Sequence, residues 1–164
     1  MKLQVKNKHC LIKCDPLAIS ITPYMLAKIS DDFHNSAESY KQKHFSLAKY
    51  SMYLSSIERG LKAAILSKEC TKSKKRFLAI SIKHNLEKVI KEFELLFINI
   101  FSKKDKKNLK NVNKLYFKKG FDYFSDEMLL EMMYGYKKMP KLEVIEKISQ
   151  KVNQFIIDNN YFKN

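Results

Sequence analysis

The chain has four histidines and three cysteines, and the histidines are scattered along it. The histidines and cysteines are His9, His34, His44, His84, Cys10, Cys14 and Cys70. A nucleophilic serine or cysteine needs a nearby base and an oxyanion site. The chain has no glycine-rich nucleophile elbow, no Walker-type phosphate loop and no Glu-x-x-His metal motif. It therefore carries no familiar catalytic signature of these kinds.

A metal site is the first alternative to consider. His9, Cys10 and Cys14 bring three soft ligands close together in the sequence, but a structural zinc ion needs four. His44 and Cys70 are the distant candidates for the fourth position. Packing within an irregular N-terminal segment explains the same residues, so we expect no metal and no other cofactor. An odd number of cysteines also favours a reducing, cytoplasmic location over a disulfide scaffold.

Positive charge is the strongest compositional feature of the chain. The 164 residues include 32 lysines and arginines against 17 aspartates and glutamates, a formal net charge of +15. Only Arg59 and Arg76 are arginines, so the side chain best suited to bidentate phosphate or guanine contacts is scarce. Lysines instead create a diffuse field that attracts RNA, nucleotides or acidic partners. A lysine-biased coding composition would explain the excess equally well.

The basic residues concentrate in two segments that we expect to connect helices. These segments are the candidate nucleic-acid-binding residues, and they comprise Lys72, Lys74, Lys75 and Arg76, followed by Lys103, Lys104, Lys106 and Lys107. Phosphate contacts from such loops would give binding that weakens steeply as salt rises.

The spacing of apolar residues predicts an all-α fold. Three glycines and three prolines are few for a sheet with tight hairpins, whereas apolar residues recur in steps of three and four. We expect helices over 23–43, 47–66, 83–101, 109–118 and 125–137, and a last one from Pro140. Charged connections separate them over 67–76 and 102–107. The first helix begins at Thr22-Pro23, an N-cap followed by proline.

Two features stand out inside the predicted helix 47–66. Glu58 precedes Lys62 by four residues, the favourable order for an intrahelical ion pair. Gly60 costs the helix about 1 kcal/mol relative to alanine. It therefore marks either a close contact between helices or a weakness that the fold tolerates.

The expected organisation is one domain over 23–164 with a short irregular N-terminal arm over 1–22. The chain length suits a single core. No apolar run approaches the roughly 18 residues that a membrane span requires, and no apolar segment typical of a secretory signal follows the first residues. We therefore expect a cytoplasmic protein with no membrane partner.

Two short motifs and an aromatic stretch carry a resemblance to a known family. The first motif comprises Glu58, Leu61, Lys62, Ala63 and Leu66. The second, His84-Asn85-Leu86, is similar to a His-Asp-Leu signature at the start of the next helix, and the aromatic stretch runs over 115–124. Over about residues 24–158 the chain resembles the HEPN family (higher eukaryotes and prokaryotes nucleotide-binding domain). The resemblance implies an up-and-down bundle of four to five main helices that forms a homodimer.

The same resemblance implies two kinds of function. Many HEPN proteins are metal-independent ribonucleases of toxin–antitoxin, abortive-infection and CRISPR systems, with an Arg-x(4–6)-His motif near the final helix. This chain has no arginine or histidine after His84, and the nearest substitute is Arg76 with His84. Other HEPN-like proteins are non-catalytic and bind RNA, nucleotides or a nucleotidyltransferase-type partner.

We therefore predict a non-catalytic RNA- or nucleotide-binding module of a toxin–antitoxin or defence system. The first alternative is a toxin-like endoribonuclease with Arg76 and His84 as its catalytic residues. The second is a helical partner protein with a purely structural role, whose exposed apolar patch would comprise Met128, Leu129, Met132, Met133 and Tyr136.

In the binding-module interpretation, Glu58, Lys62 and His84 form a polar pocket, and His84 caps or orients the third helix. The simpler interpretation is an isolated Glu58–Lys62 pair with a buried histidine nearby. Four tyrosines at helical positions could stack on bases, but such residues more often belong to a core or a dimer interface; they are Tyr50, Tyr53, Tyr116 and Tyr123.

Overall fold

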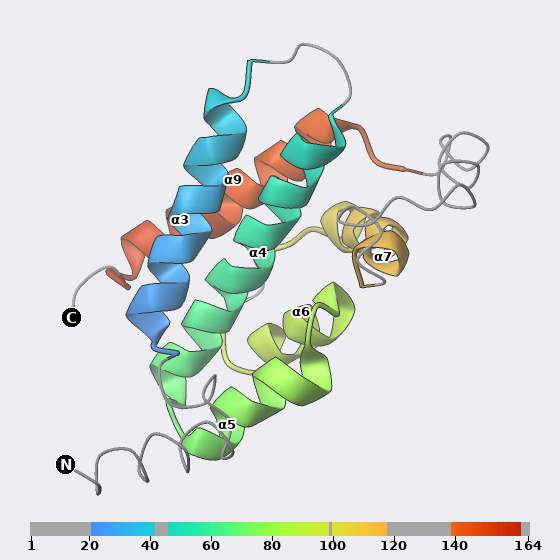
Figure 1. Ribbon diagram of the computed structural model, residues 1–164. Helices are drawn as coiled ribbons and strands as arrows, with labels where there is room; N and C mark the ends of the chain where they lie inside the picture. Colours follow the sequence, from blue (N-terminus) through green and yellow to red (C-terminus); the bar gives the residue numbers. More distant parts are fainter. Residues whose placement is uncertain (1–20, 42–45, 99, 118–138, 162–164) are drawn as a thin grey trace, which may run out of the picture.

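The computed structural model describes residues 21–41, 46–98, 100–117 and 139–161 (Figure 1). Its elements are α3 (Pro23–Ser39), α4 (Leu47–Lys68), α5 (Lys72–Arg76), the π-helix η1 (Phe77–Ile82), α6 (Leu86–Glu94), α7 (Lys103–Phe117) and α9 (Leu142–Asp158). The described ranges contain no strand, which confirms the all-α class. The expected helix over 125–137 and residues 1–20 of the expected arm over 1–22 lie outside these ranges.

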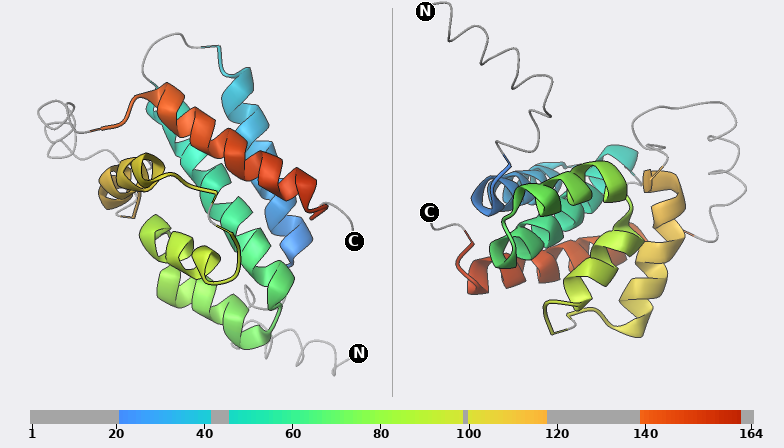
Figure 2. Two further views of the ribbon diagram at one scale, coloured as in Figure 1. Left: turned by 180° about the vertical axis from the view of Figure 1, so that it is seen from behind. Right: turned by 90° about the horizontal axis from the view of Figure 1, so that it is seen from below.

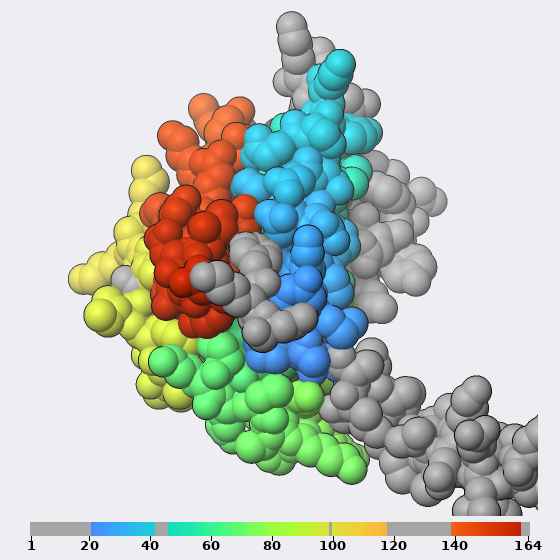
Figure 3. Space-filling model, turned by 90° about the vertical axis from the view of Figure 1, so that its left-hand side faces the viewer, coloured from blue at the N-terminus to red at the C-terminus, as the bar shows by residue number. Residues whose placement is uncertain are grey.

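The helices form a bundle around α4. Helices α3 and α4 lie side by side and antiparallel, and the view from behind shows α9 crossing both of them (Figure 2). A space-filling view shows α3 and α9 covering one face together (Figure 3). On another side of α4 lie η1, α6 and α7. Apolar side chains from all the long helices meet in one core cluster.

Burial around α4 is far more complete than a one-sided apolar stripe would produce. Every residue from Ser56 to Leu66 except Arg59 is buried. Helices α3 and α9 cover one side of this stretch, and α6 covers another. The polar residues Glu58 and Lys62 are therefore carried into the interior, where they need partners.

Gly60 lies where α4 packs closely against α3 and α9. A Cβ atom at this position would lie 2.6 Å from Val152 Cγ1 and 2.9 Å from Ser30 Oγ. The Ser30 hydroxyl is itself held by a 2.8 Å hydrogen bond to the Ser56 carbonyl. Of the two interpretations drawn from the sequence, the close helix contact is the one observed.

Gly60→Ala should therefore destabilise the protein, although alanine is the better helix former. The gain in helix propensity is about 1 kcal/mol, while overpacking of a tight core costs about 1–3 kcal/mol. We expect a net loss of up to about 2 kcal/mol in the free energy of unfolding, measured by urea denaturation. Lys68→Ala, at an exposed end of the same helix, is the control. A stabilised Gly60→Ala protein would contradict the close contact.

The largest correction to the predicted elements is the start of α7. Residues 102–107 were expected to be a connection, but the helix begins at Lys103. Its first turn is closed by reciprocal hydrogen bonds: Asp105 N donates to Ser102 Oγ over 3.1 Å, and Ser102 N donates to Asp105 Oδ2 over 3.0 Å. Such side-chain caps satisfy amides that the helix leaves free. The lysines of this segment therefore lie on a helix.

The chain from 67 to 101 also differs from the expectation. Helix α4 runs to Lys68, and residues 72–76 form α5, capped by a 3.1 Å hydrogen bond from Lys74 N to Thr71 Oγ1. Residues 77–82 form a π-helix. The helix expected over 83–101 is shorter than predicted: α6 covers only the nine residues Leu86–Glu94. Near the chain ends, α3 stops at Ser39, and α9 begins at Leu142.

Candidate functional site

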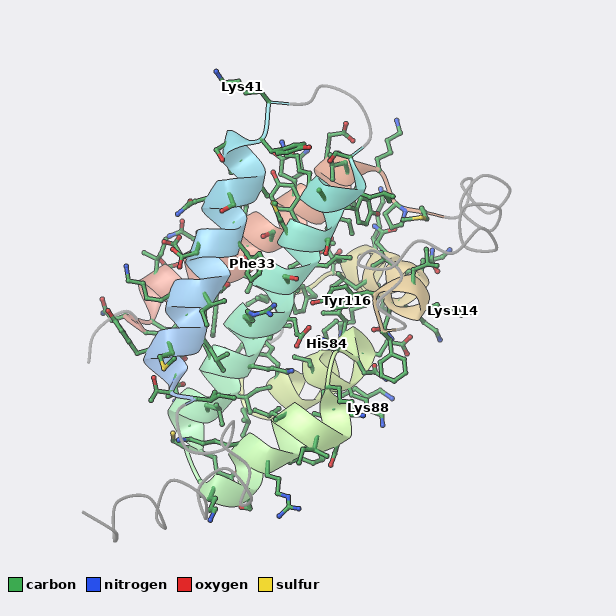
Figure 4. The ribbon with its side chains drawn as sticks, viewed as in Figure 1. Phe33, Lys41, His84, Lys88, Lys114 and Tyr116 are labelled. Carbon is green, nitrogen blue, oxygen red and sulfur yellow. The ribbon has the colours of Figure 1, made fainter. Side chains whose placement is uncertain are left out.

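The buried carboxylate of Glu58 is the centre of the polar site. Its side chain is 3 % exposed and accepts hydrogen bonds from three parts of the chain. Lys62 Nζ donates to Oε1 over 2.6 Å, while His84 Nδ1 and Tyr116 OH donate to Oε2 over 3.0 and 2.6 Å. Figure 4 shows His84 and Tyr116 close together between α4, α6 and α7. One carboxylate thus links α4, the start of α6 and α7.

The partners of Glu58 keep it ionised despite its burial. Burial by itself would raise the pKa of Glu58, but the hydrogen bond from His84, the charge and hydrogen bond of Lys62 and the hydrogen bond from Tyr116 together lower it to about 2. Burial, followed by the nearby Glu58 charge, raises the pKa of Tyr116 well above its ordinary value. At neutral pH the site therefore contains a carboxylate and a neutral phenol.

Lys62 also holds an unusual turn of the backbone. Its Nζ donates to the Lys83 carbonyl oxygen over 2.5 Å. Lys83 has φ 51° and ψ −122°, a conformation that residues with a side chain rarely adopt. This turn joins η1 to α6 and sets the position of the next residue, His84. Lys62 therefore supports both the carboxylate and the backbone that presents the imidazole.

His84 combines a fixed orientation with access to solvent. Its side chain is 40 % exposed, and its ring meets that of Tyr116 edge to face, with centroids 6.1 Å apart. Because an ionised carboxylate only accepts hydrogen bonds, the proton of a neutral imidazole must sit on Nδ1. The Nε2 atom then carries a lone pair that can accept a proton or a hydrogen bond.

Two asparagines fix the start of α6 beside the site. Asn85, not His84, caps the helix, accepting a 3.1 Å hydrogen bond from Lys88 N. Asn113 of α7 accepts a 2.8 Å hydrogen bond from Leu86 N, and its amide donates to Asn85 Oδ1 over 3.2 Å. Of the two roles expected for His84, capping or orienting the third helix, capping is therefore wrong. The asparagine side chains satisfy this helix end instead.

The polar-pocket residues Glu58, Lys62 and His84 are thus brought together, whereas Arg76 is not part of the cluster. Arg76 lies exposed at the end of α5. Arg59 is the nearer arginine: its Nη1 donates to the Ser55 carbonyl, its guanidinium lies 4.6 Å from the Phe33 ring centroid, and its charge acts on Tyr116. The arrangement offers His84 an orienting carboxylate but no contact with Arg76.

The two predicted basic segments both reach the C-terminal end of α6. Lys74 pairs with Glu92 over 2.9 Å, and Lys106 pairs with Glu94 over 2.6 Å. These two lysines are therefore partly neutralised. The remaining members of the segments are at least partly exposed: Lys72, Lys75, Arg76, Lys103, Lys104 and Lys107.

A row of lysines along α7 was missed in the sequence because the helix was expected to begin later. Its members are spaced by four, three and four residues, all are exposed, and they comprise Lys103, Lys107, Lys110 and Lys114. This spacing places them on one face of a helix. We call these four residues the α7 lysine row. The one acid of α7, Asp105, is buried and paired with Lys151 over 2.7 Å.

Three of the four tyrosines considered for base stacking are buried. Tyr50 and Tyr53 are fully buried, and Tyr116 is 7 % exposed, so they belong to the core. Tyr53 donates a 2.8 Å hydrogen bond to Glu38. Tyr123 and the expected apolar patch over 128–136 lie outside the described residues. Within the described ranges, Leu95 and Ile98 are the most exposed large apolar residues, at 78 % and 91 %.

Comparison with known proteins gives no relative from which a function could be transferred. No protein-family model, curated protein or solved structure matches the chain. No group of three or more histidines, cysteines or acids in the described ranges could hold a metal ion; His9, Cys10 and Cys14 lie outside them. None of the helices described is both long and apolar enough to cross a membrane.

Proposed function

We propose that this protein is an HEPN-like, non-catalytic module that binds RNA through the exposed lysines of α6 and α7. The α7 lysine row is the observation that carries this proposal. Four lysines follow one another along a helix of fifteen residues, over about 16 Å at 1.5 Å per residue. Such a row can contact several phosphates of one strand without reading its sequence.

Three of the four acids of α6 and α7 are paired with lysines, and the fourth, Glu87, lies in the first turn of α6. Asp105 is already paired with Lys151, and at the end of α6, Glu92 and Glu94 are paired with Lys74 and Lys106. Two further lysines of α6, Lys88 and Lys91, are exposed. The resulting field favours a polyanion over a small neutral ligand.

Removing the α7 lysine row should weaken RNA binding and flatten its salt dependence. The variant combines Lys103→Gln, Lys107→Gln, Lys110→Gln and Lys114→Gln. For single strands the logarithm of affinity falls with the logarithm of salt by about 0.7 per phosphate contact, so the slope should decrease by about 3. Fluorescence anisotropy with a labelled single-stranded RNA tests this, with the affinity measured from about 50 to about 300 mM KCl.

A charge-matched variant serves as the control for this experiment. It replaces four exposed lysines elsewhere, Lys28, Lys41, Lys141 and Lys147, by glutamine. Both variants lose the same net charge, so an equal loss of affinity in the two would contradict a specific role of α7. Failure of the wild-type protein to bind RNA at low salt would overturn the proposed function itself.

The orientation of His84 favours one second candidate, a metal-independent endoribonuclease. In that reaction Nε2 would accept the proton of a ribose 2′-hydroxyl. The 2′-oxygen would bond to the adjacent phosphorus, and the 5′-oxygen would leave with a proton from water. Glu58 supports this alternative by holding the imidazole, whereas the absence of Arg76 from the cluster weighs against it.

Incubation of total RNA with the purified protein separates the two candidates. The binding-module proposal expects intact RNA with both the wild-type protein and His84→Ala. A ribonuclease would cleave the RNA and lose about 100-fold or more of its rate on removal of a general base. Equal cleavage by both proteins would remove His84 from the chemistry.

A further inference from the structure

A solvent-facing hollow lies between η1 and α6, apart from the Glu58 cluster. Its volume is about 220 Å³. Phe77 and Ile82 supply an apolar wall, and the polar part of the lining comes from Ser81, Lys88, Lys91 and Glu92. The described ranges contain no bond between this lining and the carboxylate of Glu58. The hollow is therefore a separate place for a ligand.

Phe77 gives the hollow an aromatic wall that a ligand can reach. The residue is 38 % exposed, in contrast to the buried Tyr50, Tyr53 and Tyr116. Lys74 Nζ lies 5.5 Å from the Phe77 ring centroid, and the same nitrogen pairs with Glu92. Lys74 therefore contacts both the aromatic ring and the carboxylate that line the hollow.

The rest of the lining has the groups that a nucleotide requires. Lys88 and Lys91 are exposed on the outer face of α6 and can contact a phosphate. The Ser81 hydroxyl and the Glu92 carboxylate can hydrogen-bond the edge of a base. A flat aromatic group next to lysines is the combination by which proteins bind single strands without strong sequence preference.

Helix α6, which lines the hollow, packs beside α7, which carries the lysine row. Helices α6 and α7 are antiparallel, because Asn113 contacts Leu86 at one end and Lys106 contacts Glu94 at the other. Lys88 of α6 and Lys114 of α7 project on the same side of the molecule (Figure 4). A strand following the row can therefore cross α6 and reach the hollow.

Resting on the proposed RNA-binding function, we infer that the hollow binds one unpaired nucleobase of the RNA, stacked on Phe77, with its phosphate at Lys88 and Lys91. Bases within a duplex are paired and stacked, so they cannot enter. The α7 lysine row supplies affinity for the backbone, and the hollow supplies the preference for single-stranded over double-stranded RNA.

Phe77→Ala and Phe77→Leu test this subsite. Loss of one base–aromatic stack, about 1–3 kcal/mol, corresponds to a fall of about 5- to 150-fold in affinity for single-stranded RNA. Leucine preserves an apolar wall but has no π face, so Phe77→Leu should cause a similar loss of affinity. It keeps the subsite testable if Phe77→Ala folds poorly. The salt slope should remain that of the wild-type protein, because no phosphate contact is removed. Affinity for a blunt RNA duplex should not change.

Ile80→Ala is the matched control, since Ile80 lies in the same π-helix, is 45 % exposed and does not line the hollow. A loss in Phe77→Ala no larger than that in Ile80→Ala would overturn the subsite, as would an equal loss for duplex RNA. Either result with normal wild-type binding leaves the proposed function intact. No RNA binding by the wild-type protein would overturn both.

Discussion

Glu58→Ala is expected to destabilise the folded protein by about 3–5 kcal/mol, as removal of one partner from a buried ion pair does. Lys62 would keep its buried charge without the carboxylate that it contacts at 2.6 Å. Tyr116, which is buried, would lose its acceptor as well. The free energy of unfolding from urea or thermal denaturation measures the effect. A loss of this size would approach half the stability of a typical small domain, about 5–15 kcal/mol.

Two comparisons show whether the loss arises from the cluster. Glu143→Ala removes an exposed carboxylate from the first turn of α9 and should cost no more than about 1 kcal/mol. The double variant Glu58→Leu, Lys62→Met removes both charges and should be more stable than Glu58→Ala, since replacing a buried pair by apolar residues is often nearly neutral. A Glu58→Ala protein as stable as Glu143→Ala would show that the cluster contributes nothing.

The helices that the sequence predicts correctly are those whose signals are local. Thr22 caps α3, accepting a 3.1 Å hydrogen bond from Met25 N, with Pro23 in the first helical position. The apolar spacing of α4 also predicts its start at Leu47. Caps and apolar periodicity act within one or two turns, so they can be recognised without knowledge of the fold.

The sequence contains a local signal for the start of α7. It was overlooked because the many lysines of residues 102–107 suggested a charged connection. Ser102 and Asp105 have the spacing of a capping box, and they form its two hydrogen bonds. With the helix starting at Lys103, the four-three-four spacing of the α7 lysine row becomes visible. The same residues, taken as a loop, gave only a diffuse basic cluster.

The polar site could be predicted only in part, for a physical reason. Glu58 and Lys62 are four residues apart on one helix, so their pairing is a local property. Tyr116 contacts the same carboxylate although it lies 58 residues further along the chain. The contact of His84 with the carboxylate depends on the turn at Lys83. Both contacts are set by how α6 and α7 pack against α4, and no local pattern encodes that packing.

The cluster around Glu58 also predicts how stability depends on acid. The folded-state pKa of Glu58 is about 2, below its ordinary value of 4.5. A carboxyl whose pKa is lowered by folding contributes stability above its unfolded pKa and loses it as pH falls through the folded pKa. At about 1.4 kcal/mol per pKa unit, Glu58 should contribute about 3 kcal/mol that disappears between about pH 4.5 and 2. Burial would raise the pKa of Asp105, but its contacts with Lys151 and Ser102 lower it. Asp105 should therefore also contribute stability that is lost as the pH falls.

The difference in stability between the wild-type protein and Glu58→Gln isolates this contribution. General charge repulsion grows in both proteins as the pH falls, so it largely cancels in the difference. We expect the gap in the free energy of unfolding to be largest above about pH 5 and to shrink by about 3 kcal/mol by pH 2, because only the wild-type carboxylate is protonated there. Glutamine preserves the shape of the side chain and an oxygen acceptor for Lys62, His84 or Tyr116. A gap that stays constant from pH 5 to 2 would mean that these three donors do not hold Glu58 in its ionised form.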